Sequence, residues 1–136
     1  MANRLAEIVR SAPYFPVPDV ASIGAYYRDV LGFRCEYAAG DPPEFALCVR
    51  GASSIMFRRV ANAGLISPNE KQGGTWDVFL WVDDVDALHD ELTRKGADVV
   101  YAPVVQHYGM KEFAVRDPNG YVLGLGQEWP AKVAAS

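Results

Sequence analysis

Apolar residues follow a strand-then-helix pattern near the start of the chain. The strand-like segment Pro13 to Val17 leads to Asp19, whose carboxylate suits the N-cap of a helix. Apolar side chains then return at every third or fourth position, as on one face of a helix, at Val20, Ile23, Tyr27 and Val30. Gly32 follows, and glycine is suited to the left-handed residue that ends a helix. The pattern predicts a strand, a helix and a stop.

The same order begins again in the second half of the chain. A strand-like segment from Trp76 to Val82 leads to Asp84, and an amphipathic stretch then runs to Lys95. Asp84 lies 65 residues after Asp19, and the closing glycines, Gly32 and Gly96, lie 64 apart. A duplicated strand–helix unit predicts two equivalent sheets with room for a ligand between them.

Three further strand-like runs follow each expected helix. They are Phe33–Tyr37, Glu44–Val49 and Ser53–Arg58 in the first half, and Asp98–Tyr101, Glu112–Arg116 and Tyr121–Gly126 in the second. The order βαβββ, used twice, places the chain in the α+β class. We expect an N-terminal arm (1–10, a short helix or a frayed lead) and one domain (11–128). That domain divides into module one (11–60), a linker (61–75) and module two (76–128), and a tail (129–136) follows.

Composition narrows the class of partner. The 136 residues suffice for one compact domain, and the net charge of -4 argues against nucleic acid, which requires a basic surface. No apolar run reaches the length of a membrane span, and residues 1–10 lack the apolar core of a secretory signal. Cys35 and Cys48 lack CxxC spacing, so we interpret both as reduced strand residues of a cytoplasmic protein.

Four segments, taken together, resemble the vicinal oxygen chelate superfamily, which includes glyoxalase I, extradiol dioxygenases and the fosfomycin- and bleomycin-resistance proteins. They are Val17-Pro18-Asp19-Val20, Tyr26-Tyr27-Arg28-Asp29-Val30-Leu31-Gly32-Phe33, Trp81-Val82-Asp83-Asp84-Val85, and Phe113-Ala114-Val115-Arg116-Asp117-Pro118-Asn119-Gly120-Tyr121. The resemblance spans about Ala12 to Gln127. It implies two βαβββ modules whose sheets form a half-open barrel around a cavity, and a homodimer.

The resemblance also implies where a divalent metal would bind. Enzymes of this superfamily use three or four His or Glu ligands on cavity-facing strands, and the matching positions here are Ala12, Met56, Asp77 and Gly124. Alanine and glycine lack a ligand atom, a thioether is a poor ligand for these metals, and one carboxylate cannot fix a catalytic site. His89, on the exposed side of the second helix, and His107, in a loop, match no ligand position. We therefore expect no metal and no cofactor.

Strand alternation around these positions predicts what the cavity contains instead. Phe79 and Trp81 share a face with position 77, Arg58 shares one with Met56, and Tyr14 shares one with position 12. In related binding proteins an aromatic residue followed by glycine lies at the cleft rim, and Tyr108-Gly109 matches that pattern. The expected ligand-binding residues are Tyr14, Met56, Arg58, Asp77, Phe79, Trp81, Tyr108 and Gly124.

This set suits an organic molecule with a flat or conjugated part and a charged group. Three alternatives stay open for individual residues: the aromatics belong to the core, Asp77 and Arg58 neutralise each other, and Tyr108 closes a hairpin. The charged segment Asp117-Pro118-Asn119-Gly120 is better explained as a turn than as a catalytic group.

The sequence favours a metal-free, bleomycin-resistance-like binding protein over an enzyme. We expect a cytoplasmic homodimer that sequesters an aromatic or cationic natural product or metabolite. Two other functions remain open. One is a lyase, isomerase or dioxygenase of the glyoxalase type, metal-dependent or using Asp77, Tyr14 or Tyr108 as acid or base. The other is a regulatory module without a small-molecule ligand.

Overall fold

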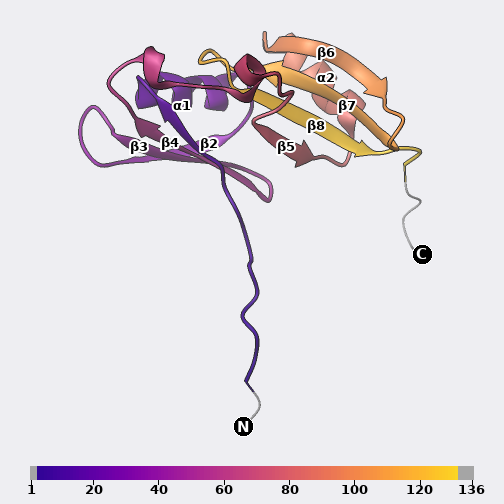
Figure 1. The fold of residues 1–136 in the computed structure, drawn as a ribbon, viewed down its shortest axis with the longest axis horizontal. Coiled ribbons are helices and arrows are strands. Elements are labelled where there is room, and N and C mark those ends of the chain that lie inside the picture. The colour runs from indigo at the N-terminus through magenta and orange to yellow at the C-terminus, as the bar shows by residue number, and fades with distance from the viewer. Residues whose placement is uncertain (1–2, 132–136) are drawn as a thin grey trace.

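The computed structural model describes residues 3–131 (Figure 1). Module one forms the first half of the fold. Its elements are β1 (Tyr14–Val17), α1 (Val20–Asp29), β2 (Arg34–Ala38), β3 (Phe45–Arg50) and β4 (Ser53–Arg59). The four strands form one sheet in the order β1-β4-β3-β2. β1 runs parallel to β4, and the other neighbours are antiparallel.

Module two repeats this arrangement. Its elements are β5 (Val78–Trp81), α2 (Val85–Arg94), β6 (Asp98–Val105), β7 (Met110–Arg116) and β8 (Val122–Glu128). The sheet order is β5-β8-β7-β6, with β5 parallel to β8. The α+β fold of two βαβββ modules is confirmed, with two open sheets side by side (Figure 1).

The helix boundaries follow the expected capping chemistry. Asp19 accepts a hydrogen bond from the Ser22 N–H at 3.0 Å, and Asp84 accepts one from the Ala87 N–H at 3.0 Å. After each helix the chain reverses at a glycine with positive φ, 76° at Gly32 and 88° at Gly96. These local signals set where each helix begins and ends.

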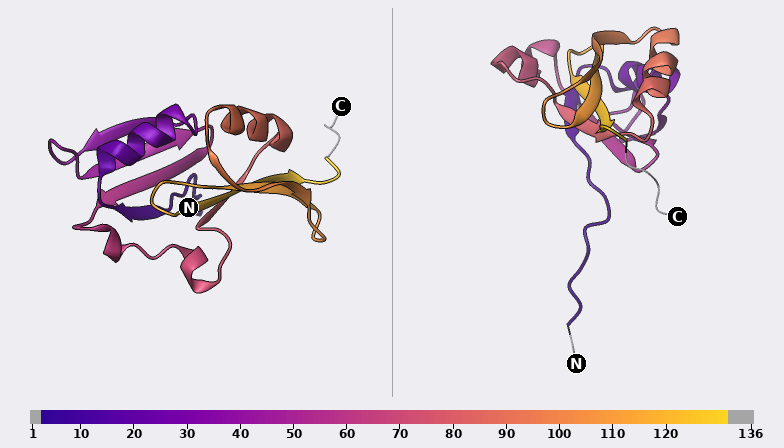
Figure 2. Two further views of the ribbon diagram at one scale, coloured as in Figure 1. Left: turned by 90° about the horizontal axis from the view of Figure 1, so that it is seen from above. Right: turned by 90° about the vertical axis from the view of Figure 1, so that its right-hand side faces the viewer.

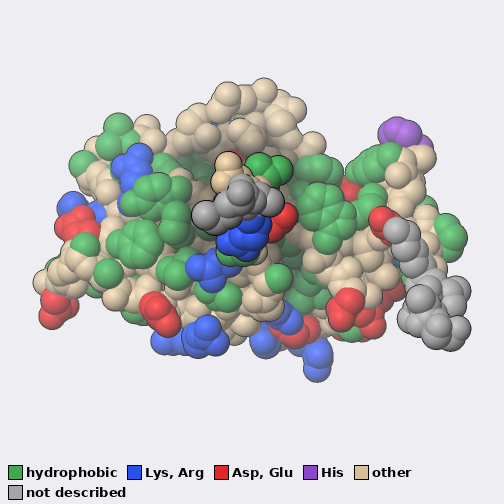
Figure 3. Space-filling view, turned by 90° about the horizontal axis from the view of Figure 1, so that it is seen from below, with side chains coloured by type: hydrophobic (Ala, Val, Ile, Leu, Met, Phe, Trp, Pro, Cys, Tyr) green, Lys and Arg blue, Asp and Glu red, His purple; other side chains and the backbone are tan. Residues whose placement is uncertain are grey.

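Each helix covers one face of its own sheet, so the opposite face is left open (Figure 2). The strand side chains that face the helices are buried and apolar: Phe15, Val17, Ile55, Phe57, Phe113, Val115, Leu123 and Leu125. The alternation predicted for β1, β4 and β8 is therefore confirmed. We call the uncovered side the open face. Hydrophobic side chains gather on it on either side of the N-terminal arm (Figure 3).

Two reciprocal contacts join the modules. Arg50, at the β3–β4 turn, donates two hydrogen bonds to Glu91 on α2, at 2.7 and 2.9 Å. In the opposite direction, the Tyr27 hydroxyl on α1 donates to Asp117, at the β7–β8 turn, at 2.9 Å. The Tyr121 ring also stacks on Phe15, with centroids 4.1 Å apart. Each module thus places one hairpin turn against the other module's helix.

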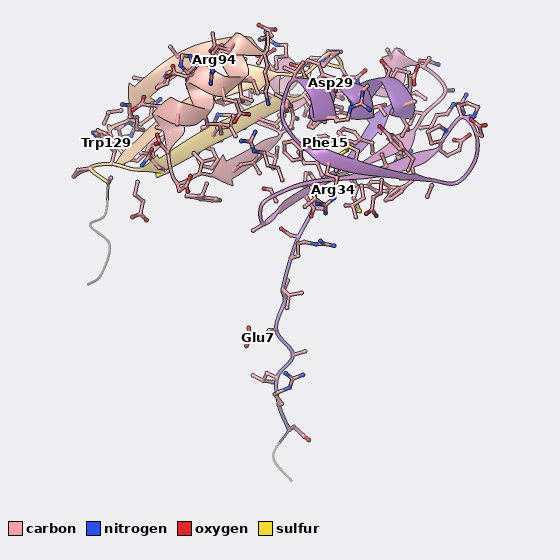
Figure 4. All side chains as sticks on the ribbon, turned by 180° about the vertical axis from the view of Figure 1, so that it is seen from behind. Glu7, Phe15, Asp29, Arg34, Arg94 and Trp129 are labelled. Atoms are coloured by element: carbon pink, nitrogen blue, oxygen red, sulfur yellow. A yellow bond between two sulfur atoms is a disulfide. The ribbon has the colours of Figure 1, made fainter. Side chains whose placement is uncertain are left out.

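The linker between the modules contains short helical turns, and the described part of the N-terminal arm contains none. Linker 61–75 contains two 3-10 turns, η1 (Ala63–Leu65) and η2 (Asn69–Gln72), and Ile66 between them is buried in the core. Residues 3–13 contain no helix, so the helical alternative for the arm is wrong. The arm points away from both modules, as Glu7 shows in Figure 4. The expected arm and tail also include residues 1–2 and 132–136, which lie outside the described residues.

Two predictions about individual side chains are wrong. Cys35 and Cys48, taken as reduced, form a disulfide, because the β2–β3 register sets them directly opposite each other with Cα atoms 4.0 Å apart. His89, expected on the exposed side of α2, is only 24% exposed and lies against the Phe113 ring, 5.2 Å between centroids. Across residues 3–131, neither helix has the length and apolar character needed to cross a membrane.

Candidate functional site

The open face of module two has two glycines at its centre. On β8, Gly124 pairs with Phe79 and Gly126 pairs with Trp81 of β5, while Glu112 of β7 pairs with Gly126 from the other side. Directly paired residues point to the same side of a sheet. The register therefore brings two aromatic side chains and one carboxylate together over a strip without side chains.

The glycines make room for aromatic rings that pack directly against the backbone of the sheet. A Cβ atom at Gly124 would lie 2.7 Å from both the Phe79 and the Trp76 rings, and one at Gly126 would lie 2.9 Å from the Phe79 ring. The centroids of these two rings are 4.7 Å apart, and the Trp81 ring continues the row 5.0 Å from Phe79. The space predicted for a ligand at Gly124 is occupied by these side chains.

Trp76 belongs to this face even though strand alternation assigns it to the other one. It precedes β5, which begins at Val78, so the period of two does not apply to it. Its indole Nε1 donates a hydrogen bond to the Tyr101 hydroxyl on β6 at 2.9 Å. That bond links the row of rings on β5 to the far edge of the sheet.

A pocket of about 430 Å³ lies beside this row of rings. Its lining residues come from the segment before β5 and from β6, β7 and the loop between them: Thr75, Trp76, Tyr101, Ala102, Val104, Gln106, Tyr108 and Glu112. We call it the aromatic pocket. Aromatic walls with a few polar groups are typical of sites for small organic molecules.

Glu112 is the buried acid of the aromatic pocket. Glu112 is 1% exposed, and its Oε1 accepts a hydrogen bond from the Tyr108 hydroxyl. Its other oxygen, Oε2, is buried without a hydrogen-bond partner. Desolvation, together with the hydrogen bond to Glu112, raises the pKa of Tyr108 to about 12. Tyr108 therefore stays protonated at neutral pH and acts as a donor.

A larger pocket of about 750 Å³ lies between the modules. It is mostly apolar and extends along β5, with Val78, Leu80 and Leu88 on one side and Pro13 and residues 50–54 on the other. β5 is the edge strand of its sheet, so one side of its backbone has no strand partner. We call this the intermodule pocket. Its buried polar group is the Ser54 hydroxyl, which is 3% exposed and has no hydrogen-bond partner among the described residues. It has no buried carboxylate like Glu112, so we take the aromatic pocket as the candidate site for ligand recognition.

Asp77 holds the backbone together in this structure. Its Oδ1 accepts a hydrogen bond from the Asn69 N–H, and its Oδ2 accepts one from the Val122 N–H, both at 2.8 Å. The carboxylate thereby ties the linker to the start of β8. No ion pair joins Asp77 to Arg58 in the described part of the chain, so the neutralising bridge considered from the sequence does not form. A role for Asp77 in ligand binding stays a prediction.

The other expected residues form two groups. Phe79 and Trp81 line the intermodule pocket and Tyr108 lines the aromatic pocket, all on module two. Tyr14, Met56 and Arg58 lie on β1 and β4 of module one: Tyr14 pairs with Met56, and the Arg58 guanidinium lies 6.0 Å from the centre of the Tyr14 ring. These three line neither of the two pockets, and the structure does not bring them together with the module-two set.

Of the eight residues that line the aromatic pocket, sequence reasoning predicted only Tyr108, and the residues it missed include Glu112, Trp76 and Tyr101. Glu112 had a usable signal, because the alternation of β7 puts it opposite the buried Phe113 and Val115. Trp76 and Tyr101 had none, because Trp76 lies outside its strand and the β6–β7 register shifts on both sides of Tyr101. At the expected metal positions, Ala12, Met56, Asp77 and Gly124, the only carboxylate already accepts two backbone hydrogen bonds. Residues 3–131 contain no group of three His, Cys, Asp or Glu side chains placed to hold a metal ion.

Comparisons with known proteins agree with this fold. A model of the Glyoxalase/Bleomycin resistance protein/Dioxygenase superfamily matches residues 4–125. No curated protein matches the chain. The crystal structure of TioX from Micromonospora sp. ML1 is 24% identical, with a TM-score of 0.70, and the match covers 88% of this chain and 98% of that one.

Two other similar structures are of binding proteins. One is the bleomycin-binding protein from bleomycin-producing Streptomyces verticillus, complexed with copper(II)-bleomycin: 23% identity, TM-score 0.65, and coverage of 95% of this chain and 100% of that one. The other is TnmS3, an antibiotic binding protein from Streptomyces sp. CB03234: 23% identity, TM-score 0.68, and coverage of 92% and 99%. At these identities the likeness shows a shared fold.

Proposed function

The chain belongs to the glyoxalase/bleomycin resistance protein/dioxygenase superfamily, and on this premise we propose that it is a small-molecule binding protein. It sequesters an aromatic or cationic natural product or metabolite and does not use a bound metal. The observation that carries the proposal is the aromatic pocket: rings of Trp76, Tyr101 and Tyr108 surround a cavity with one buried carboxylate, Glu112.

The donor set argues against the metal chemistry of the superfamily's enzymes. Ala12 and Gly124 offer no donor atom, and the Met56 thioether is a poor ligand for hard or borderline ions. Asp77 directs both oxygens to backbone N–H groups. A catalytic site needs three protein ligands and an open position, so these residues do not fit one.

The similar structures support the proposed class of ligand. One is a bleomycin-binding protein and another an antibiotic binding protein, and both share the fold along nearly the whole chain. Bleomycin and other antibiotics are organic molecules, as the aromatic pocket would require. Fold likeness alone does not assign a ligand, so the proposal depends on the pocket and must be tested by binding.

The first test is native mass spectrometry of freshly purified protein, with elemental analysis of the same sample. A metal-free protein that carries or takes up an aromatic or cationic compound supports the proposal. Stoichiometric Zn, Ni, Mn or Fe would contradict it and favour an enzyme of the glyoxalase type. An absence of uptake across a panel of aromatic antibiotics would favour a module without a small-molecule ligand.

A variant of Trp81 tests the position of the binding face. Trp81 lines the intermodule pocket, but its ring belongs to the row that passes through Phe79 to Trp76 in the aromatic pocket. Trp81 is 73% exposed, so Trp81→Ala should leave the melting temperature nearly unchanged, and it should weaken several-fold the binding of a ligand that extends along this row. The control is Leu65→Ala, which removes an exposed apolar side chain (60% exposed) from η1. Equal binding by both variants would remove Trp81 from the site.

We also propose that the protein is a homodimer in which the arm of one copy docks on the other. Three apolar side chains of the arm, Leu5, Ile8 and Val9, are 86%, 92% and 93% exposed, an unfavourable state for large apolar groups. Arg10 and Ser11, where the arm leaves the body, line the intermodule pocket. Residues 3–9 extend away from both modules (Figure 1). The pocket of a second copy offers the arm both apolar walls and the free backbone edge of β5.

Light scattering on a sizing column tests the dimer. The wild-type chain should have twice the monomer mass, and the double variant Leu5→Asp/Ile8→Asp should be a monomer with an intact fold. Leu65→Asp, which adds a carboxylate at an exposed apolar residue outside the arm, should remain a dimer. A monomeric wild-type protein would contradict the proposal.

The proposed location is the cytoplasm, and the Cys35–Cys48 disulfide makes that location testable. Disulfides persist mainly in oxidising compartments and are rare in the cytosol, so the bond between Cys35 and Cys48 counts against the proposed location, which requires that this pair is reduced in the cell. Trapping free thiols in intact cells with an alkylating reagent, followed by mass measurement, should find both cysteines alkylated if the protein is cytoplasmic. Protection of both from the reagent would contradict the location.

A further inference from the structure

The buried acid of the aromatic pocket has more hydrogen-bonding capacity than the described residues use. Glu112 is 1% exposed, and its Oε2 makes no hydrogen bond of normal geometry, although the nearby Tyr101 hydroxyl interacts with its charge, which adds to burial in raising the pKa of Tyr101. Burying a carboxylate without a full set of donors is costly, and such groups are rare in folded proteins. The lining of the pocket contains no Lys, Arg or His. The protein therefore keeps an acid in an apolar site and supplies no cation to it there.

The donor that Glu112 does have comes from a side chain able to leave. Tyr108 lies in the β6–β7 loop and is 48% exposed, and its hydroxyl reaches in to Oε1 of Glu112. The loop is closed by the Gln106 N–H donating to the Met110 carbonyl at 2.7 Å, and Gly109 has a φ of 82°. The phenol thus covers the carboxylate from the rim of the pocket, and its withdrawal would open Glu112 to the cavity.

The walls next to Glu112 suit a cation attached to a flat ring system. Trp76 and Tyr101 line the same pocket, and their rings are joined through the indole–hydroxyl hydrogen bond of 2.9 Å. Aromatic faces attract cations, and hydrogen bonds to a carboxylate from a charged donor are about twice as strong as neutral ones. We propose that Glu112 binds a protonated amine or amidinium group of an aromatic ligand, in the place that the Tyr108 hydroxyl holds in this structure.

This inference rests on the proposed function, and it assigns a residue and a ligand chemistry to the site. The probes are 9-aminoacridine, a planar cation with N–H donors, and acridine at pH 8, which has the same ring system without charge. Binding is followed by the fluorescence of each probe, in wild-type protein and in Glu112→Gln. Glutamine keeps the shape of the side chain and removes its charge.

The wild-type protein should bind 9-aminoacridine at least about tenfold more tightly than acridine. Glu112→Gln should lose about tenfold in affinity for 9-aminoacridine and keep its affinity for acridine. Equal affinity of the wild type and Glu112→Gln for 9-aminoacridine would overturn the assignment of Glu112 while leaving a binding protein. Failure of the wild type to bind either probe would overturn both the assignment and the proposed aromatic site.

A second variant keeps the test open if Glu112→Gln does not fold. Tyr108→Phe preserves the ring and removes the hydroxyl that competes with the ligand for Glu112. It should bind 9-aminoacridine several-fold more tightly than the wild type and acridine about equally. Weaker binding of 9-aminoacridine by Tyr108→Phe would show that the phenol contacts the ligand, and would overturn its role as a stand-in.

Discussion

The buried carboxylate of Asp117 gives a prediction about stability and pH. Asp117 is 3% exposed and accepts hydrogen bonds from the Tyr27 hydroxyl at 2.9 Å, the Asn119 N–H at 2.8 Å and the Tyr121 N–H at 3.1 Å. Burial outweighs these donors and raises the pKa of Asp117 from 3.8 to about 6. The folded protein therefore keeps Asp117 as the neutral acid up to about pH 6, whereas an unperturbed carboxyl ionises above 3.8.

The sign of the effect follows from proton linkage. As pH rises above 3.8, the unfolded chain releases the Asp117 proton first, and the folded chain retains it up to about pH 6. The stabilisation that Asp117 contributes is therefore complete below pH 3.8 and is lost as the pH rises through about 6. A pKa difference of about two units corresponds to about 3 kcal/mol in the free energy of unfolding.

Asp117→Asn should remove this pH dependence. The amide keeps an oxygen for the two N–H donors, and its NH₂ group faces the Tyr27 hydroxyl, which can accept instead of donate. Relative to the wild type, the variant should gain about 2–3 kcal/mol between pH 4 and pH 8. The assay is urea unfolding at a series of pH values, followed by intrinsic fluorescence.

The control is Glu36→Gln, an exposed carboxylate on β2, whose stability difference from the wild type should stay flat across the same range. A difference between Asp117→Asn and the wild type that is independent of pH would refute the reasoning. It would mean that the three donors compensate the buried charge fully. A loss of stability in Asp117→Asn that grows with pH would refute it more strongly, because the ionised form would then be the preferred one.

Two other variants test the packing that positions the site. Gly124→Val should push the Phe79 and Trp76 rings off the sheet, because a Cβ would lie 2.7 Å from both rings. We expect the free energy of unfolding to fall by about 1–3 kcal/mol and the tryptophan emission to change. Unchanged emission would contradict this displacement of the rings. Arg50→Ala should cost about 1 kcal/mol at pH 7, a value discounted because the Arg50 and Glu91 side chains are 36% and 28% exposed. The Arg50 contact lowers the pKa of Glu91 to about 2, so this cost should shrink as pH falls toward that value, which melting curves at pH 7 and pH 3 would detect.

The sequence by itself determined the local structure and the direction of most strand side chains. Asp19 and Asp84 cap their helices, and Gly32 and Gly96 follow them with positive φ, because these effects act within one or two turns of chain. The apolar side of β8 was also predictable, since alternation along a strand depends only on the pleat. The two-module fold followed from the repetition of these local signals.

Only the tertiary structure decided which side chains meet. Register, which depends on the whole sheet, set Cys35 opposite Cys48 and brought Glu112 next to the glycine strip of β8. Trp76 reached the same pocket from irregular backbone, where no periodicity applies. Asp77, which the sequence presented as a free carboxylate, found two backbone N–H groups from distant segments. Such pairings are long-range, so the pattern along one strand carries no information about the partner across it.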